Sequence, residues 1–421
     1  MKRSQWLATL AQNATPHLDE CIEYLGSTCA WLHDFKHTPQ DEEWHAEGNV
    51  YIHTQLVLAE LYKVLATDAV HITGVRRQAL ILGAVLHDIA KPIQTRVEVL
   101  HGKTRVIAPQ HESVGRSYLA PRLMELELPF DVIWQVLHLV GEHHMPKTLA
   151  LKESAASDFY RLARQVDTEL LYWLEVADMR GRICPDLDWQ LLCLDEFKAQ
   201  AQALNVWGQS TRLRTLMASH LMTLSPPAQR YVYAYGLALM ENGSVTQLEE
   251  VLGKTYSHRE RYAHLVMTVG LSGSGKSTWL ARQYPDYEVI SLDDLREEIN
   301  GKRSSQKQFG QIIQTAKARL KAALREHRGV VWDATNLRME LRAQILDLAR
   351  DYHALITMAV FTLPLKTIWQ QNNEREYCLP NSVLQRQIEQ WQLPTLSEAH
   401  HYQVIGEEGK LLYESGNWST L

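Results

Sequence analysis

A chain of 421 residues exceeds the size of one ordinary hydrophobic core, so two or three domains are expected. Hydrophobic residues make up 45% of the chain and charged residues 22%, a balance that excludes an intrinsically disordered protein. The formal net charge of −6 gives no global sign of a nucleic-acid binder. Any contact with nucleic acid must therefore come from local basic patches.

The five cysteines are scattered along the chain, and no two of them form a Cys-x-x-Cys pair. This usage predicts reduced thiols in a cytoplasmic protein rather than a disulfide framework. No apolar stretch reaches membrane-spanning length, and the first sixteen residues, MKRSQWLATLAQNATP, lack a long apolar core. We therefore expect a soluble, cytoplasmic protein with no membrane partner, whose oligomeric state the sequence leaves open.

Helical periodicity dominates the first half of the chain. Four segments carry apolar residues at helical spacing or are apolar nearly all round, namely residues 57–65, 78–86, 132–140 and 170–177. These segments predict an all-helical domain over residues 1–185. Residues 186–260 also look helical, and we interpret them as a bridge to which no chemistry is assigned.

The pattern changes at about residue 261. Short apolar runs rich in β-formers then alternate with stretches of helical length; the runs are residues 265–269, 288–291, 330–332 and 355–361. This alternation is typical of βαβ units around a parallel sheet. Residues 261–421 are therefore predicted to form an α/β domain.

A phosphate-binding loop stands at the start of this second domain. The octapeptide Gly-Leu-Ser-Gly-Ser-Gly-Lys-Ser at residues 270–277 fits the GxxxxGK[ST] pattern between a predicted strand and a predicted helix. Backbone N–H groups in such a loop surround phosphate oxygens, Lys276 adds a charge and the Ser277 hydroxyl can bind Mg²⁺. The expected nucleotide-binding residues are Gly270, Ser272, Gly273, Ser274, Gly275, Lys276, Ser277 and Thr278. The sequence therefore predicts ATP and Mg²⁺ as cofactors, against the alternative of a glycine-rich turn without a ligand.

A second polar segment follows at the predicted end of the next strand, where ligands of open α/β sheets gather. Asp293 there could accept the proton of an attacking hydroxyl, and Arg296 could hold an acceptor phosphate. The alternative is a helix N-cap with a solvated arginine. By spacing alone the two interpretations stay equally open.

A set of histidines and aspartates marks the first half. His87 and Asp88 stand in tandem at the end of an apolar helical run, and His53, His111, His143, His144 and Asp178 lie on other predicted helices. These side chains are ligand types for a divalent transition metal held in a helical core. Asp178 follows a strongly apolar stretch, and a metal would compensate the cost of burying its carboxylate. A lone histidine is more often an ordinary core or surface side chain, so the inference depends on the whole set.

The second domain resembles the 5′-hydroxyl polynucleotide kinase domain of phage end-healing enzymes. The resemblance rests on GLSGSGKSTW, SLDDLR and the Asp-Ala-Thr-Asn segment at residues 333–336, and it covers roughly residues 265–394. It implies that Asp293 is the general base and that Arg296 contacts the acceptor phosphate. The family's lid carries two arginines over the ATP phosphates. Here Arg375 matches one of them, and Arg342 is a weaker candidate for the other.

The first domain resembles the HD phosphohydrolase superfamily over roughly residues 44–182. The segments HTQLVL, LHDIAKP, QHESVG and ADMRGR carry the family's H…HD…D pattern. The resemblance implies metal ligation by His53, His87, Asp88 and Asp178, with His111, His143 and His144 placed for a second metal. Whether one metal or two is bound stays open at this point; with two, Asp88 would lie between the ions. Lys91 could stabilise developing phosphate charge, and the equally open alternative is a solvated lysine. His45 is interpreted as structural.

The fusion of the two domains resembles the bacterial HD-Pnk end-healing enzymes. The fold expected is an all-α HD domain followed by an α/β P-loop kinase domain with a parallel sheet. The function implied is RNA repair: phosphorylation of 5′-OH ends with ATP, and hydrolysis of 2′,3′-cyclic phosphate or 2′-phosphate ends with a metal such as Mn²⁺. The implied partners are RNA ends, with DNA ends left open, and a nucleic-acid ligase.

Two other functions stay open at this point. One is a small-molecule or nucleoside kinase joined to a nucleotide phosphohydrolase. Comparing a nucleoside with a short oligonucleotide as the phosphate acceptor would distinguish it from a polynucleotide kinase. The other is a regulatory ATPase switch. A switch needs no acceptor base, so Asp293 and Arg296 argue against it.

Overall fold

The computed structural model describes residues 1–209, 212–303, 307–375 and 377–418. The chain divides into two compact units, Met1–Arg212 and Leu213–Leu421. This division splits the segment 186–260 that was expected to form a bridge. Helix α11 (Leu187–Ala203) packs on α8 and α10 within the first unit, whereas the three helices that follow belong to the second unit.

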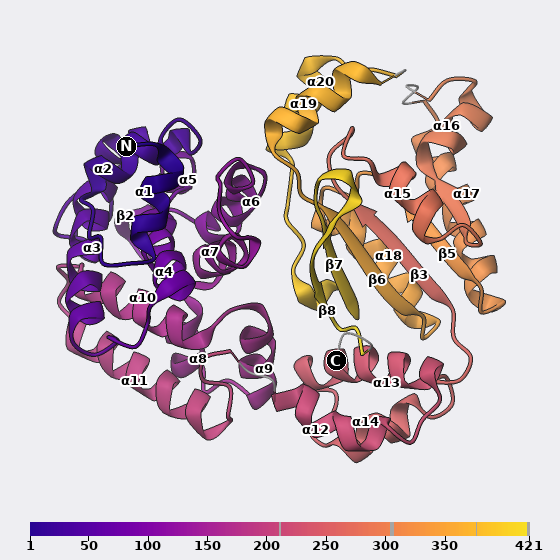
Figure 1. The fold of residues 1–421 in the computed structure, drawn as a ribbon, viewed down its shortest axis with the longest axis horizontal. Coiled ribbons are helices and arrows are strands. Elements are labelled where there is room, and N and C mark those ends of the chain that lie inside the picture. Colours follow the sequence, from indigo (N-terminus) through magenta and orange to yellow (C-terminus); the bar gives the residue numbers. More distant parts are fainter. Residues whose placement is uncertain (210–211, 304–306, 376, 419–421) are drawn as a thin grey trace. The chain divides into compact units, whose positions relative to one another are not determined.

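The first unit is a bundle of helices, coloured indigo to magenta in Figure 1. Its helices are α1 (Arg3–Leu10), α2 (Leu18–Leu25), α3 (Val50–Ala66), α4 (Gly74–Leu86), α5 (Lys91–Gln94), α6 (His111–Leu123), α7 (Phe130–Glu142), α8 (Met145–Leu151), α9 (Ala156–Gln165), α10 (Thr168–Arg180) and α11, with a 3₁₀ helix at Ala30–His37. The four segments with helical periodicity lie in α3, α4, α7 and α10. These four helices pack against one another and form the centre of the unit.

Local signals explain where the central helices begin. Asn49 caps α3 because its Oδ1 accepts a hydrogen bond from the amide of Ile52 at 3.0 Å. Asp167 caps α10 by accepting from the amides of Glu169 and Leu170. Ten successive residues of α4 and nearly all of α10 are buried, as expected for helices that are apolar all round.

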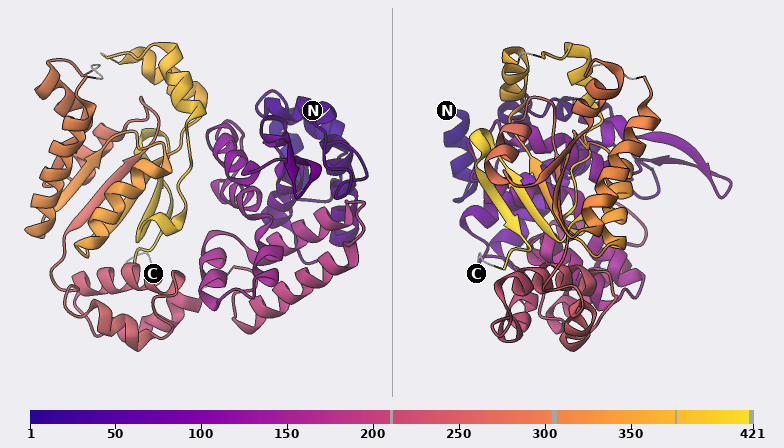
Figure 2. Two further views of the ribbon diagram at one scale, coloured as in Figure 1. Left: turned by 180° about the vertical axis from the view of Figure 1, so that it is seen from behind. Right: turned by 90° about the vertical axis from the view of Figure 1, so that its right-hand side faces the viewer.

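One β-hairpin interrupts this helical unit and departs from the all-helical expectation. Strands β1 (Arg96–Leu100) and β2 (Lys103–Ile107) pair in antiparallel fashion and turn at His101 and Gly102. The hairpin is inserted between α5 and α6, and the right-hand view of Figure 2 shows it extending away from the helices of its unit. Asp41 fixes its base by accepting from the Arg105 guanidinium and the Val106 amide.

The second unit is built on a six-stranded sheet with the order β4-β5-β3-β6-β7-β8. Its strands are β3 (His264–Val269), β4 (Glu288–Ser291), β5 (Gly329–Asp333), β6 (Leu355–Phe361), β7 (His401–Ile405) and β8 (Leu411–Ser415). All neighbouring pairs are parallel except β7 and β8. The α/β fold with a parallel sheet is therefore confirmed, and β7 and β8 extend it beyond the four strands that were predicted.

Helices surround this sheet and leave the carboxyl ends of its strands open. They are α12 (Arg212–Leu221), α13 (Pro226–Glu241), α14 (Leu248–Thr255), α15 (Lys276–Gln283), α16 (Leu292–Asn300), α17 (Phe309–Arg325), α18 (Met339–Asp351), α19 (Leu365–Glu374) and α20 (Asn381–Glu389). Tyr231 and Ala234 of α13 pack on Leu355, so α13 lies at the amino end of β6. Within the described residues, no helix combines the length and the hydropathy needed to cross a bilayer.

Gly181 ends α10 at a close approach to α3. A Cβ added there would lie 2.8 Å from Val57 Cγ2 and 2.9 Å from Val57 N, a backbone atom that cannot move aside. We expect Gly181→Ala to lower the free energy of unfolding of the first unit by about 1–3 kcal/mol, because the two helices must separate. Urea unfolding followed by circular dichroism measures the change.

Gly253 in α14 offers the matched control, since a Cβ there meets nothing within 4 Å. Gly253→Ala should leave stability unchanged or raise it, because alanine is the better helix former. Equal losses in both variants would contradict the assignment of a tight α3–α10 contact.

Candidate active sites

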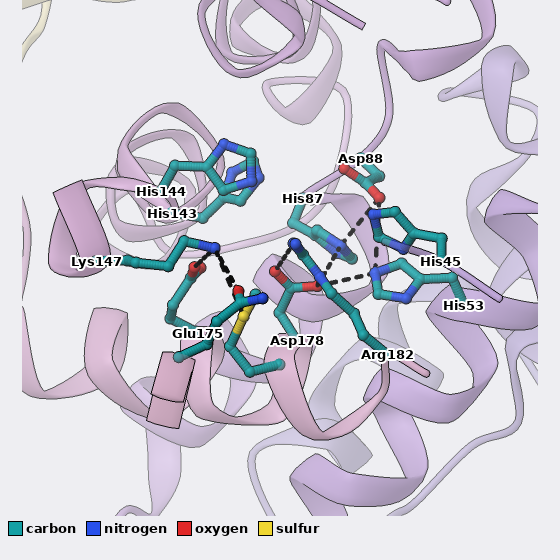
Figure 3. A network of polar contacts seen from close by, with 12 residues as sticks. His45, His53, His87, Asp88, His143, His144, Lys147, Glu175, Asp178 and Arg182 are labelled. Carbon is teal, nitrogen blue, oxygen red and sulfur yellow. Dashed lines mark hydrogen bonds and ion pairs between the residues drawn. The ribbon is translucent and has the colours of Figure 1, made fainter. Parts of the chain in front are cut away.

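The first site lies in the core of the first unit, where five helices bring histidine and aspartate side chains together. Its members are His53 of α3, His87 and Asp88 at the end of α4, His111 at the start of α6, His143 at the end of α7 and Asp178 of α10. Figure 3 shows His53, His87, Asp88 and Asp178 directed toward one another. Each of the six residues is at most 5% exposed. The structure therefore brings together the metal-ligand set that was predicted from the sequence.

Two groups can be distinguished within this cluster. In the first, His53 Nε2 lies 2.8 Å and His87 Nε2 lies 3.8 Å from Asp178 Oδ1. In the second, His111 Nε2 lies 3.4 Å from His143 Nε2, and His144 stands beside them. Ligand atoms within each group lie within 4.8 Å of one another, close enough to surround one ion.

Asp88 stands between the two groups. Its Oδ2 lies 3.2 Å from His87 Nε2, and its Oδ1 lies 3.2 Å from His111 Nε2. One carboxylate with an oxygen turned to each group has the placement of a bridging ligand. This arrangement fits two ions better than one.

The histidine rings share one orientation. The Nδ1 atoms of His87, His111 and His143 lie 2.7–2.9 Å from backbone carbonyl oxygens of Ala84, Ala108 and Val140, respectively. His144 Nδ1 lies 2.7 Å from a Glu112 oxygen, and His53 Nδ1 lies 2.9 Å from a Glu47 oxygen. Each partner is an acceptor, so the proton resides on Nδ1 and the Nε2 lone pair faces the centre.

Several buried polar atoms in this cluster have no well-directed hydrogen bond. Four of them face the centre, namely Nε2 of His53 and of His87 and both carboxylate oxygens of Asp88, and a fifth is His53 Nδ1 beside Glu47. Buried polar groups are normally satisfied, because an unpaired one costs free energy. Divalent cations bound here would satisfy the four atoms that face the centre, so the residues present fit a metal centre.

The charge state of these groups also favours a cation. Burial lowers the pKa of His143 well below the usual value, and neighbouring histidines lower it further. Burial alone would raise the pKa of Asp88, but opposing interactions, the charge of Lys91 among them, hold that pKa well below its usual range. Neutral imidazoles and ionised carboxylates are the forms that bind metal.

Three surrounding residues were not identified from the sequence. Glu47 lies against both His45 and His53, Glu112 against His144, and Arg182 binds Asp178 Oδ2 while Oδ1 faces His53. Arg182 stands four residues after Asp178, the helical spacing of an ion pair, so its role had a detectable signal. Glu47 comes from an irregular segment before α3, and only the tertiary structure reveals it.

Lys91 occupies the position expected for a residue beside the cluster. Its Nζ lies 2.7 Å from Asp88 Oδ2 and donates to Gln40 Oε1 at 2.6 Å. His45, interpreted as structural, has its Nδ1 2.8 Å from Glu47, and burial lowers its pKa to about 4. The cluster reaches solvent beside His144, whose side chain is 33% exposed.

The second site is a cavity of about 2000 Å³ at the carboxyl ends of the strands of the second unit. All predicted nucleotide-binding residues from Ser272 to Thr278 line it, together with Arg375, Asp293 and Arg296. Gly270 lies at the base of the loop, where its carbonyl oxygen accepts a hydrogen bond from Lys276 Nζ at 3.0 Å. The predicted kinase residues are thus gathered around one cavity.

Backbone geometry shapes the phosphate loop. Gly273 and Gly275 have φ values of +87° and +81°, which L-residues with side chains rarely adopt. The turn at Gly275 starts α15 at Lys276, so the first amides of this helix face the cavity. Burial lowers the pKa of Lys276 to about 8, and the charge of Asp333 partly offsets that shift.

Asp333 adds a carboxylate beside the serine hydroxyl of the phosphate loop. It ends β5, and its Oδ2 accepts from Ser277 Oγ at 3.2 Å while its Oδ1 accepts from Thr268 Oγ1 at 3.1 Å. A serine hydroxyl beside a carboxylate is the oxygen donor set that suits Mg²⁺. From the sequence, Asp333 stands out only through residues 333–336, the segment that resembles the phage polynucleotide kinase domain.

The capping alternative for Asp293 can be examined in α16. Ser291 occupies the N-cap position, and its side chain accepts from the amide of Asp294 at 3.2 Å. Asp293 is therefore not needed as the cap. Its carboxylate instead forms an ion pair with Arg296, one turn further along the same wall of the cavity.

Two further contacts concern the lid. The guanidinium of Arg342 is buried and binds Glu398 and the carbonyl oxygens of Asn336 and Leu337. Arg342, the weaker candidate for the second lid arginine, therefore has a structural role. On α20, Gln387 Oε1 accepts from the amide of Ser272 at 3.0 Å. That amide belongs to the phosphate loop, so the side-chain oxygen stands where a phosphate oxygen would bind.

Two parts of the chain match known protein families. Residues 50–179 match the HD domain family, and residues 265–394 match the AAA domain family. A search among curated proteins finds no match. The chain therefore joins an HD domain to a P-loop, kinase-like domain, an arrangement that supports a phosphohydrolase combined with a kinase.

Glu47 generates a prediction for metal binding. We expect Glu47→Gln to weaken Mn²⁺ affinity by about 10–100-fold, because a neutral amide holds the His53 ring less firmly and lowers its basicity. Isothermal titration with Mn²⁺ measures the change. Glu43→Gln is the matched control, since Glu43 is a surface carboxylate paired with Arg105. The Mn²⁺ affinity of this variant should equal that of the native protein. Equal affinity in all three proteins would contradict the role of Glu47.

Lys276 generates a prediction for pH dependence. Its pKa of about 8 in the free protein leaves it largely neutral at pH 8.5, and polyphosphate bound beside it must raise that pKa. ATP binding at pH 8.5 should therefore take up as much as about one proton, and much less at pH 7. Titration calorimetry in buffers of different ionisation enthalpy measures the uptake. Lys276→Arg should abolish it, and uptake that persists in this variant would assign the proton elsewhere.

Proposed function

We propose that this chain heals broken RNA at both ends of a cleavage site. The P-loop domain would transfer the terminal phosphate of ATP to a 5′-OH end. The HD domain would hydrolyse a 2′,3′-cyclic phosphate or 2′-phosphate end. A nucleic-acid ligase would then join the healed ends, with cytoplasmic RNA as the main substrate.

The kinase step follows from the walls of the second cavity. Mg²⁺, when bound at Ser277 and Asp333, supplies charge neutralisation for the ATP phosphates. Lys276 and the loop amides hold the terminal phosphates, with Arg375 as a further cation. Asp293 accepts the proton of the 5′-OH as its oxygen bonds to the γ-phosphorus, the bond to the β-phosphate oxygen breaks and ADP leaves. Arg296, freed from Asp293, holds the acceptor phosphate.

The hydrolytic step follows from the buried cluster. A divalent metal, when bound, supplies Lewis acidity and makes a coordinated water more acidic. Asp178 is held by Arg182 so that one oxygen faces the centre. Lys91, adjacent to Asp88, is placed to bind phosphate oxygens on which negative charge develops. Water attacks phosphorus, and the bond to one ribose oxygen breaks.

One observation carries the proposal: two phosphate-chemistry sites occur in one chain. In the first, a phosphate loop shares its cavity with the Asp293–Arg296 pair. The second is the cluster of unsatisfied metal-ligand atoms in the other unit. The first suits phosphoryl transfer to a hydroxyl, and the second suits metal-assisted phosphoester hydrolysis. Cleavage of RNA through its 2′-OH produces both substrates together. A regulatory ATPase switch would not require the Asp293–Arg296 pair.

The test uses two labelled RNA ends with the full-length protein. One RNA carries a 5′-OH and is incubated with ATP and Mg²⁺; the other carries a 2′,3′-cyclic phosphate and is incubated with Mn²⁺. We expect a 5′-phosphate on the first RNA and loss of the cyclic phosphate on the second. Absence of either product from the native protein would remove the corresponding half of the proposal.

Single variants should separate the two activities. Asp293→Ala should reduce 5′ phosphorylation by at least about 100-fold, because the proton acceptor is lost, and leave hydrolysis unchanged. His87→Ala should abolish hydrolysis and leave phosphorylation unchanged, because the two centres lie in separate units. Loss of both activities in either variant would contradict independent centres.

A further inference from the structure

A lysine and a glutamate lie beside the metal-ligand cluster of the first unit, and the hydrolytic step described above uses neither. Lys147 belongs to α8 and Glu175 to α10. The Lys147 side chain is 19% exposed and the Glu175 side chain is fully buried. Figure 3 shows the Lys147 amine directed toward Glu175. Ionisable groups are rarely enclosed in this way without a partner or a function.

The position of Lys147 in the chain places it next to both groups of metal ligands. It follows His143 and His144 by four and three residues, and the backbone between them is helical. Residues at this spacing lie on one face of a helix. On the other side, Lys147 Nζ lies 3.6 Å from Sδ of Met179, the residue next to Asp178. The amine is therefore held between the two helices that supply ligands to the separate groups.

The hydrogen bonds of Lys147 are made to neutral atoms. Its Nζ donates to Gln190 Oε1 at 2.9 Å and to the thioether sulfur of Met179. Glu175 Oε1 lies 3.8 Å away, beyond hydrogen-bond distance. An ammonium group has three hydrogens, and the described residues supply well-directed acceptors for two of them. One hydrogen is thus left for a ligand.

Glu175 does not neutralise this amine. Both of its carboxyl oxygens are buried without a hydrogen-bond partner. Burial, assisted by the charge of Asp178, raises the pKa of Glu175 to about 8, so the carboxyl is mostly protonated at neutral pH. Lys91 and Arg182, by contrast, each contact an ionised carboxylate of the ligand set. Among these three cations, Lys147 is the one whose charge is available to a bound anion.

An available cation at this place favours the more highly charged of the two proposed substrates. A cyclic phosphate end carries one negative charge, whereas a phosphate monoester carries about −1.5 to −2 at pH 7. The cluster reaches solvent beside His144, one helical turn from Lys147. A phosphate that enters there comes within reach of the amine, and a charge-assisted hydrogen bond suits its additional anionic oxygen.

We propose that Lys147 binds the phosphate of a monoester substrate, such as a 2′-phosphate end, and that this contact sets the ability of the centre to hydrolyse monoesters as well as cyclic diesters. The inference rests on the proposed hydrolytic function and assigns a specificity residue to it. In the monoester step the water oxygen bonds to phosphorus, the bond from phosphorus to the ribose oxygen breaks, and one water proton ends on that oxygen as inorganic phosphate leaves. Lys147 holds a phosphate oxygen and neither gives nor takes a proton.

The experiment compares monoester and diester hydrolysis by the full-length protein with Mn²⁺. One substrate pair is RNA with a 2′-phosphate or a 2′,3′-cyclic phosphate end, and the other is p-nitrophenyl phosphate or bis(p-nitrophenyl) phosphate. In Lys147→Met the ratio of monoester to diester kcat/KM should fall about ten-fold in both pairs, mainly through KM, because one charge-assisted hydrogen bond is lost. Lys147→Arg should keep most of the ratio, because it keeps the charge. Diester hydrolysis serves as the internal check on folding.

Two matched variants separate this role from a structural one. Lys152→Met removes an exposed lysine just after α8 and should keep the native ratio. Glu175→Gln keeps the shape of a neutral carboxyl and should also keep it. If Glu175→Gln lowers the ratio as much as Lys147→Met, the two residues form a structural ion pair and the proposal is wrong. Equal losses of monoester and diester hydrolysis in Lys147→Met would also overturn it, because they indicate damage to the shared centre.

The outcomes distinguish this inference from the proposed function. If the native protein hydrolyses both RNA ends and Lys147→Met keeps the native ratio, the assignment of Lys147 is wrong and the hydrolytic function stands. If the native protein hydrolyses the nitrophenyl esters but neither RNA end, RNA healing by this domain fails, and the nitrophenyl ratio still decides the role of Lys147. A native protein that hydrolyses diesters only would overturn the inference, and one that hydrolyses none of the four substrates would overturn both.

Discussion

Both candidate centres depend on the cost of burying charge. Asp88 and Asp178 are almost fully enclosed by protein, and Lys276 of the phosphate loop is partly enclosed. Removing such groups from water is unfavourable unless an opposite charge is supplied. In the first unit the compensation inside the protein comes from Lys91 and Arg182, and unsatisfied nitrogen and oxygen atoms are still left over. Each centre is thus incomplete in a way that a bound ion or phosphate corrects.

The two units build their centres from different chemical groups. The HD cluster uses rigid side chains from five helices, and backbone carbonyls fix three of its imidazoles. Its geometry therefore depends on how the helices pack. The phosphate loop uses main-chain amides of one short segment and depends on two glycines with positive φ. Packing errors far along the chain should disturb the first centre much more than the second.

Sequence patterns predicted the fold and the centres wherever the signal was local. The P-loop octapeptide, the His87-Asp88 pair and the apolar runs of β3–β6 each lie within a few residues of chain. Roles that depend on contacts distant in the sequence could not be predicted. Glu47 lies against His53 but comes from an irregular segment. Asp333 is recognised as a partner of Ser277 only when β5 and the phosphate loop are seen side by side. The short hairpin β1–β2 and the last two strands of the sheet, β7 and β8, had too little periodicity to be recognised within their surroundings.

The contact between Gln387 and the Ser272 amide links the phosphate loop to α20. The Gln387 side chain satisfies this partly buried donor with a neutral oxygen, so no charge has to be displaced when a nucleotide binds. Phosphate and glutamine compete for the same hydrogen, and α20 must give up its hold as the loop is filled. The position of α20 therefore depends on whether nucleotide is bound. Gln387 can hold the helix against the loop only when the Ser272 amide is not bonded to phosphate.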